Sequence, residues 1–192
     1  MLSDVNEFHL VFKALQFSAD KHRHQRRKDR EQSPYINHPI DVAELLWGVG
    51  LVRDVQIIAA GILHDTLEDT QTTADEIRIA FGETVLSLVQ EVTDDKSLPK
   101  EVRKRLQVEH APHKSLGAKQ IKLADKISNI RDLAHSPPAN WPLQRRRDYL
   151  AWAEQVVAGL RGANPELENH FDQMIEIARI KVEESAQHIE LD

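Results

Sequence analysis

The sequence predicts an all-α protein, and three observations support that prediction. Apolar residues recur at alternating steps of three and four through most of the chain, the period of a helix face packed on a core. No stretch of any length alternates between apolar and polar residues as a half-buried strand does, and no internal repeat is present. Proline, glycine and capping residues divide the chain into about nine helical segments. We expect a single domain over residues 1–192, with a core at 4–162 and a last helix at about 166–185.

The N-terminal third contains two predicted helices joined by a basic segment. The first covers residues 4–22, with Ser3 or Asp4 as its cap, and the second begins at Pro39, directly after His38. Between them lie a basic run at 22–30 and a turn at 32–34. Such a run is explained equally well as a solvated helix end or as an anion-binding arm, so both interpretations remain open.

The middle of the chain is predicted to form four shorter helices. Asp54 caps the first of these over 55–66, a second follows at 74–81, and Gly82 ends it. Apolar spacing marks a third helix, and Pro99 begins the fourth. That fourth helix carries a cationic cluster of Lys100, Arg103, Lys104 and Arg105. An exposed helix face is the simpler explanation of this cluster, which gains a function only if it overhangs a site.

A long helix over 118–135 is expected after a loop at 110–117, where Pro112 prevents a helical pairing of two histidines. It has one apolar stripe and one polar stripe, the latter formed by Asp125, Asn129 and Asp132. A polar stripe is ordinarily a solvated face. Asp125, however, stands in an otherwise apolar stretch, where a carboxylate needs a partner. Two more helices follow, at 143–160 and 166–185.

Composition narrows the classes of function. The chain has no cysteine, which excludes disulfides, zinc–thiolate sites and a thiol nucleophile. Its net charge is −6, from 31 acidic and 25 basic side chains, which argues against general coating of nucleic acid. No apolar run is long enough to cross a membrane, and the N-terminus does not resemble a signal peptide. We expect a cytoplasmic protein without nucleic-acid or membrane partners.

The segment His64-Asp65-Thr66-Leu67-Glu68-Asp69 follows an apolar run at 57–63 that has the character of a buried helix. Glu68 and Asp69 come four residues after His64 and Asp65, so they lie one turn further along if the helix continues. Without a cation, the mutual repulsion and desolvation of these groups would be costly. The pattern therefore predicts a metal site with two further carboxylates beside it.

Four residues are candidate ligands: His38, His64, Asp65 and Asp125. Mixed nitrogen and oxygen donors suit manganese, iron or zinc better than calcium. Glu68 and Asp69 could position a water molecule or move protons. Because no Gly-rich phosphate loop and no G-x-S-x-G motif is present, metal-assisted hydrolysis is the favoured reaction class. The basic run and the cationic cluster would suit a polyphosphate substrate.

The order His…His-Asp…Asp resembles that of the HD-domain metal-dependent phosphohydrolases. Within them the chain is similar to the (p)ppGpp hydrolases: the hydrolase domain of the Rel/SpoT enzymes and the stand-alone small alarmone hydrolases, which include the metazoan SpoT homologues. The segments that carry this resemblance span most of residues 8–160 and come in the family's order: 25–29, 35–40, 63–70, 91–96 and 122–133.

The resemblance implies an HD-type helical bundle that holds one Mn²⁺ per chain, with Zn²⁺ or Fe²⁺ as open alternatives. It implies ligand roles for His38, His64, Asp65 and Asp125. Glu68 and Asp69 would be the catalytic acidic pair. The substrate contacts that it implies are Arg27, Lys28, Tyr35, Asn129 and, at a position where long Rel enzymes often carry threonine, Asp132. Lys100 and Arg105 are added as phosphate contacts from their charge alone.

The implied reaction removes pyrophosphate from the 3′ position of ppGpp or pppGpp, giving GDP or GTP, and a homo-oligomer is compatible with it. One alternative is an HD phosphohydrolase for another nucleotide, such as a 2′-phosphatase of NADPH. Another is an HD domain that binds a nucleotide without turnover. The loss of a ligand or of the Glu-Asp pair would mark that last class, and neither is lost here.

Overall fold

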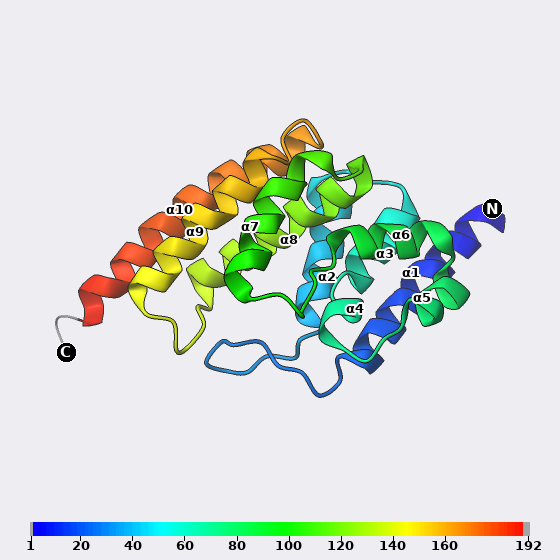
Figure 1. The fold of residues 1–192 in the computed structure, drawn as a ribbon, viewed down its shortest axis with the longest axis horizontal. Coiled ribbons are helices and arrows are strands. Elements are labelled where there is room, and N and C mark those ends of the chain that lie inside the picture. Colours follow the sequence, from blue (N-terminus) through cyan, green and yellow to red (C-terminus); the bar gives the residue numbers. More distant parts are fainter. Residues whose placement is uncertain (1, 190–192) are drawn as a thin grey trace.

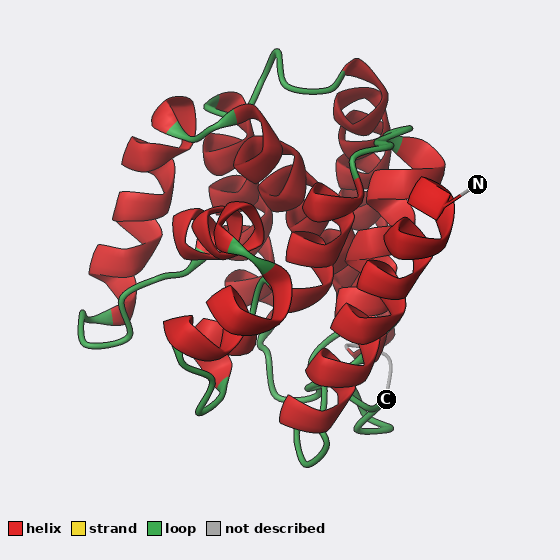
Figure 2. Cartoon of the chain, turned by 90° about the vertical axis from the view of Figure 1, so that its right-hand side faces the viewer, coloured by secondary structure: helices red, strands yellow, loops and turns green. Residues whose placement is uncertain are grey.

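The computed structural model describes the backbone of residues 2–189 and the side chains of residues 7–185. Within this part of the chain all regular structure is helical, and no strand is present (Figure 2). The elements are α1 (Leu2–Lys21), α2 (Asn37–Glu44), the π-helical η1 (Leu45–Val49), α3 (Val55–Leu63), α4 (Thr66–Asp69), α5 (Ala74–Phe81), α6 (Glu83–Val92), α7 (Lys100–His110), the 3₁₀-helical η2 (Ala111–His113), α8 (Leu116–His135), α9 (Leu143–Ala158) and α10 (Pro165–Ile189). The predicted all-α class is confirmed.

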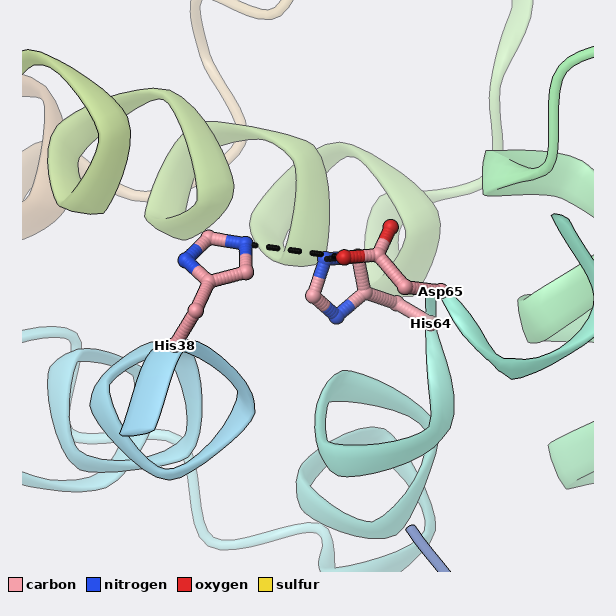
Figure 3. A group of neighbouring side chains, drawn as sticks. All are labelled: His38, His64 and Asp65. Atoms are coloured by element: carbon pink, nitrogen blue, oxygen red, sulfur yellow. Dashed lines mark ion pairs between the residues drawn. The ribbon is translucent and has the colours of Figure 1, made fainter. Parts of the chain in front are cut away.

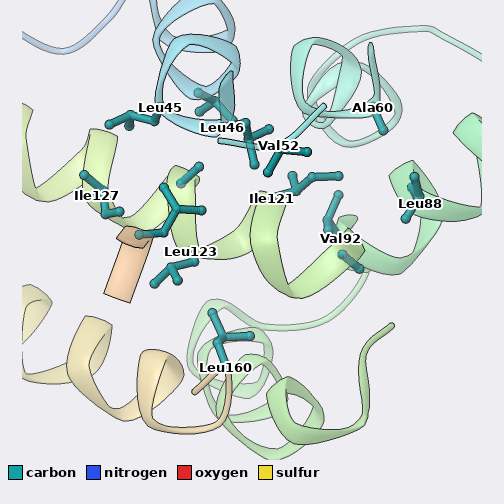
Figure 4. Packing of buried hydrophobic residues seen from close by; sticks show 14 of the residues in the cluster. Leu45, Leu46, Val52, Ala60, Leu88, Val92, Ile121, Leu123, Ile127 and Leu160 are labelled. Carbon is teal, nitrogen blue, oxygen red and sulfur yellow. The ribbon is translucent and has the colours of Figure 1, made fainter. Parts of the chain in front are cut away.

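Helix α8 runs through the middle of the bundle (Figure 1). It packs against α9 and α10 on one side and against α2, α3 and α6 on the other, while α1 covers α3. Its apolar residues Ile121, Leu123 and Ile127 are fully buried and meet Leu45 and Leu46 of η1 in the core (Figure 4). Because α8 is covered on several sides, its polar residue Asp125 is also buried.

Helices α2 and α3 approach each other closely, and this approach brings His38 near His64. At Gly61 of α3 a Cβ atom would lie 2.7 Å from the Leu46 side chain. Leu46 belongs to η1, directly after α2, so a larger residue at this position would have to displace its side chain. None of the described helices combines the length and apolarity that crossing a membrane requires.

The predicted helix over 55–66 is wrong at its end. Helix α3 stops at Leu63, and the separate turn α4 begins at Thr66. Asp65 has φ −94° and ψ −5°, and the Thr66 hydroxyl donates to the Leu63 carbonyl at 2.6 Å. Threonine competes in this way for backbone groups and interrupts the helix. The Asp69 amide still donates to the Asp65 carbonyl, so one helical turn carries Glu68 and Asp69.

Smaller differences have local causes. Helix α2 begins at Asn37, two residues before the predicted proline start. The expected loop at 110–117 is shorter, because α7 extends to His110 and a 3₁₀ turn follows. Helix α8 begins at Leu116, where the Ser115 side chain accepts from an amide of the first turn. The caps predicted at Ser3 and Asp4 lie outside the described side chains.

The basic run forms a folded loop rather than an extension of α1. The Arg27 amide donates to the Ser33 carbonyl at 2.8 Å, and the Tyr35 amide donates to the Gln25 carbonyl at 3.2 Å. The Ala139 amide donates to the Lys28 carbonyl at 2.9 Å, which ties this loop to the segment between α8 and α9. These bonds hold Arg27 and Tyr35 close to the end of α3.

Candidate metal centre and adjoining cavity

The four predicted ligands lie together, although they come from three separate parts of the chain. One ligand atom each from His38, His64 and Asp65 lies within 4.8 Å of the others (Figure 3). Nε2 of His38 is 3.3 Å from Oδ1 of Asp125 and 3.7 Å from Oδ2 of Asp65. Nε2 of His64 is 3.1 Å from Oδ2 of Asp65 and 3.9 Å from Oδ1 of Asp125.

Hydrogen bonds on the far side of each imidazole fix which nitrogen faces the carboxylates. Nδ1 of His64 lies 2.8 Å from the Gly61 carbonyl, so Nδ1–H must donate, and in the neutral ring Nε2 carries the lone pair. Nδ1 of His38 lies 2.9 Å from the Ser128 hydroxyl. This is how proteins orient metal-binding histidines.

Nε2 of His64 is the strongest indication of a cation. It is buried, makes no well-aligned hydrogen bond, and has the carboxylate oxygens of Asp65 and Asp125 as its near polar neighbours. A lone pair directed at two carboxylates is repelled unless a positive species lies between them. The donor set of imidazole nitrogens and carboxylate oxygens suits a divalent metal ion.

In the metal-free protein a proton takes the place of that cation. Burial alone lowers the pKa of His64, but Asp65 and Asp125 more than reverse this and raise it to about 9. Burial likewise raises the pKa of Asp65, whereas His64 and His38 hold it well below its usual range. The pKa of Asp125 is also well below its usual range, because Lys126 and His38 outweigh burial. Metal binding therefore displaces a proton.

This electrostatic balance predicts how pH changes the stability of the metal-free protein. The folded pKa of His64, about 9, lies above its ordinary 6.5, so its contribution is complete below pH 6.5 and is lost as pH rises through 9. Burial lowers the pKa of His38 and His22. Both groups therefore reduce stability only when the pH falls below about 6.5. We expect the urea midpoint, measured with chelator present, to be highest near pH 6.5 and to decline toward pH 9.

The expected loss of unfolding free energy over this range is about 3 kcal/mol, from the linkage between proton binding and folding. His64→Asn is the control, because it removes the titrating group and should flatten the decline. A midpoint that is level or rising from pH 6.5 to 9 in the native chain would contradict the proposed charge balance.

The carboxylates of Asp125 and Asp65 are held by neighbouring donors. Lys126 donates to Oδ2 of Asp125 at 2.9 Å, and the Asn129 side-chain amide donates to Oδ1 at 2.5 Å. The Tyr35 hydroxyl donates to Oδ2 of Asp65 at 2.6 Å. Burial and the carboxylate of Asp65 raise the pKa of Tyr35, so the phenol keeps its proton and remains a donor.

Glu68 and Asp69 lie beside this cluster, and one lysine joins them. Nζ of Lys96 is 2.5 Å from Oδ1 of Asp69 and 3.3 Å from Oε1 of Glu68. The Asp94 amide donates to Oε2 of Glu68 at 3.0 Å. Burial is the main cause that raises the pKa of Glu68. Sequence reasoning missed Lys96, although it ends one of the segments that carry the family resemblance, 91–96.

A cavity of about 470 Å³ has Asp69 of the acidic pair in its wall, whereas Glu68 and the four proposed metal ligands are not among its lining residues. Of the predicted site residues, six line it: Arg27, Lys28, Tyr35, Asp69, Asn129 and Asp132. Arg27 bonds to Asp132 through Nη2 at 2.5 Å and to the Asn129 side-chain oxygen at 3.1 Å. Trp141 and Tyr149 add an aromatic wall that the sequence interpretation did not assign to the site.

Lys100 and Arg105 are not among the residues that line the cavity. Arg105 is exposed and lies 3.4 Å from Glu109 on the same helix. Burial lowers the pKa of Lys100, as do the nearby charges of Arg145, Lys104 and Lys28. Both residues stay predictions that rest on their charge, because neither belongs to the cavity wall.

Comparisons with known proteins agree with this geometry. The sequence matches the family model of the HD domain over residues 14–150. It is 53% identical over 165 residues to guanosine-3′,5′-bis(diphosphate) 3′-pyrophosphohydrolase MESH1 of Xenopus tropicalis, covering 86% of this chain and 92% of that protein. The Homo sapiens protein of that name is 55% identical over 158 residues, with 82% and 88% covered. A solved structure described as a metazoan ortholog of SpoT that hydrolyzes ppGpp superposes with a TM-score of 0.85 and 46% identity, covering 87% of this chain and 94% of the other.

Proposed function

The chain belongs to the HD domain family, and on this basis we propose that it is a guanosine-3′,5′-bis(diphosphate) 3′-pyrophosphohydrolase. It takes ppGpp or pppGpp and water and gives GDP or GTP and pyrophosphate. The observation that carries this proposal is the buried His64 Nε2, which faces the carboxylates of Asp65 and Asp125. Tyr35 and Asn129 bond to those two carboxylates and also line the cavity that has Arg27 and Lys28 on its wall.

We assign the proposed Mn²⁺ to His38, His64, Asp65 and Asp125, and these donors leave Zn²⁺ or Fe²⁺ as alternatives. When bound, such an ion supplies Lewis acidity and a nucleophilic water at neutral pH. Metal identity is tested by stripping the protein with chelator and comparing turnover after each ion is restored.

The acidic pair handles the protons in this reaction. Burial raises the pKa of Glu68, and its carboxylate accepts a proton from the attacking water. Asp69, held by Lys96 and lying 3.3 Å from the Tyr35 hydroxyl, orients that water. The new bond joins the water oxygen to the phosphorus on the 3′ oxygen, and the bond from that phosphorus to the 3′ oxygen breaks. The 3′ oxygen stays on the ribose and takes up the proton that Glu68 accepted, and pyrophosphate is released.

The basic wall of the cavity binds the phosphates. Arg27 presents a guanidinium that Asp132 and Asn129 hold in place, and Lys28 lies next to it with an exposed side chain. A fixed, partly buried guanidinium suits bidentate recognition of phosphate. We retain Lys100 and Arg105 as weaker proposed contacts, because both lie outside the cavity lining.

Replacing Arg27 by alanine should mainly raise KM. Loss of a charge-assisted hydrogen bond of about 1.5–3 kcal/mol corresponds to a rise in KM of roughly 10- to 100-fold. The kcat should change by less than about threefold, because the contact is the same in the ground and transition states. Arg23→Ala, which removes an exposed arginine from the same loop, is the control. An unchanged KM with a collapsed kcat would show that Arg27 acts in the chemical step instead.

A turnover screen with Mn²⁺ tests the function itself. The purified chain is given ppGpp, pppGpp and NADPH, and the products are separated and identified. We expect GDP or GTP together with pyrophosphate. Release of orthophosphate from NADPH alone would favour the 2′-phosphatase alternative. Saturable binding without any product would favour a nucleotide-binding domain without turnover.

We also propose that residues 1–192 act as one domain in the cytoplasm, with a homo-oligomer as the assembly to test by light scattering. The proposal of a single domain rests on one continuous hydrophobic core, to which residues from α1 through α10 contribute.

A further inference from the structure

His22 lies directly after α1 and is the first histidine of the basic run. Its side chain is 2% exposed. The interpretation of this run as a solvated helix end is therefore wrong for His22, because its ring is directed into the protein. Burying an imidazole costs more than burying an aliphatic side chain of similar size, so its contacts need an explanation.

Two sets of contacts lead from this imidazole to the proposed catalytic centre. The His22 ring stacks on the Tyr35 ring, with centroids 4.8 Å apart and planes at 26°. The Tyr35 hydroxyl donates to Asp65 at 2.6 Å and lies 3.3 Å from Asp69. One face of His22 thus supports the phenol that holds a proposed metal ligand.

The second set of contacts runs through an amide. Nδ1 of His22 lies 2.6 Å from Oε1 of Gln25, and Nε2 of Gln25 donates to the Asp69 carbonyl at 2.5 Å. Because the Gln25 oxygen can only accept, Nδ1 of His22 carries the proton. Burial lowers the pKa of His22, so the ring is neutral and this tautomer is fixed.

We infer that His22 is a positioning residue, which sets Tyr35 against Asp65 and Gln25 against the backbone of Asp69. This inference rests on the proposed function. The His22 side chain contacts neither the proposed metal ligands nor the acidic pair directly. It acts on Asp65 through Tyr35 and on Asp69 through Gln25. Loss of a group that bonds directly to a metal ligand, as Tyr35 does to Asp65, changes affinity or activity by about 10- to 100-fold, and His22 holds that group in place.

The test compares His22→Ala with His22→Phe. Alanine removes the stack and the hydrogen bond, whereas phenylalanine keeps a ring against Tyr35 and loses only the donor to Gln25. We expect His22→Ala to weaken Mn²⁺ binding, measured by calorimetry without substrate, by roughly 10-fold or more. We expect His22→Phe to restore most of this affinity while kcat on ppGpp stays about 10-fold low and KM is unchanged.

Phe17→Ala is the matched control. Phe17 packs edge-on against Phe81, so its loss also destabilises α1 but leaves Tyr35 and Gln25 untouched. If His22→Ala lowers the melting temperature as Phe17→Ala does and leaves Mn²⁺ affinity and kcat at native values, the role of His22 is structural and the inference fails. The calorimetric comparison needs no substrate, so it tests the role of His22 even if the native chain does not hydrolyse ppGpp. Failure of the proposed function can therefore be distinguished from failure of this inference.

Discussion

Replacing Asp65 by asparagine should abolish turnover and leave the chain folded. The substitution keeps the size of the side chain but removes the charge that lies 3.1 Å from Nε2 of His64 and 3.7 Å from Nε2 of His38. Because the proposed ion contributes several kcal/mol of charge stabilisation, we expect kcat/KM on ppGpp to fall by about 10³-fold or more. Mn²⁺ titration by calorimetry should show at least about 100-fold weaker binding, since a ligand is lost as well as its charge.

The same variant has a second readout that needs no substrate. With chelator present, the carboxylate of Asp65 is a main cause that raises the pKa of His64. Asp65→Asn should therefore weaken the decline in stability between pH 6.5 and 9. Asp95→Asn is the control, because Asp95 is an exposed loop residue whose side chain bonds to Ser97. An Asp65→Asn protein that binds Mn²⁺ and hydrolyses ppGpp as the native chain does would disprove the metal assignment.

The local pattern of the sequence was enough for the fold class but not for the shape of the site. Apolar periodicity depends on neighbours within one helix, and all nine predicted segments contain a helix. The break at His64-Asp65 depends instead on a competition between the Thr66 hydroxyl and the backbone, which periodicity does not register. That break changes the direction of the chain between the proposed ligands and the acidic pair.

Residues that act through tertiary contacts were the ones that sequence reasoning missed. Lys96 and His22 appear in the sequence as ordinary loop and helix-end cations, and only the packed structure places them against Asp69 and Tyr35. The role of Arg105 stays a prediction, because a charge on a predicted helix does not reveal which way that helix faces, and this side chain lies beside Glu109 outside the cavity lining. Asp125 was found because burial of a lone carboxylate is costly wherever it occurs.

Replacing Glu68 by glutamine should separate chemistry from metal binding. Glu68 makes none of the close approaches that join His38, His64, Asp65 and Asp125, so Mn²⁺ affinity should stay within about threefold of native. Glutamine still accepts the hydrogen bond from the Asp94 amide and preserves the shape of the site, but it cannot take a proton from water. Loss of general base catalysis should lower kcat by about 10²- to 10⁴-fold while KM changes little.

The pH dependence of kcat makes this assignment specific to Glu68. Burial raises the pKa of this carboxyl, and a base works only when ionised, so kcat of the native chain should fall on the acid side at a pH above the ordinary value of 4.5. In Glu68→Gln that acid limb should disappear and leave a low, level rate. Glu101→Gln, an exposed glutamate on α7, is the control. If Glu68→Gln keeps native kcat and the same acid limb, Glu68 is not the base, and the proton must pass to Asp69, the other carboxylate that Lys96 holds.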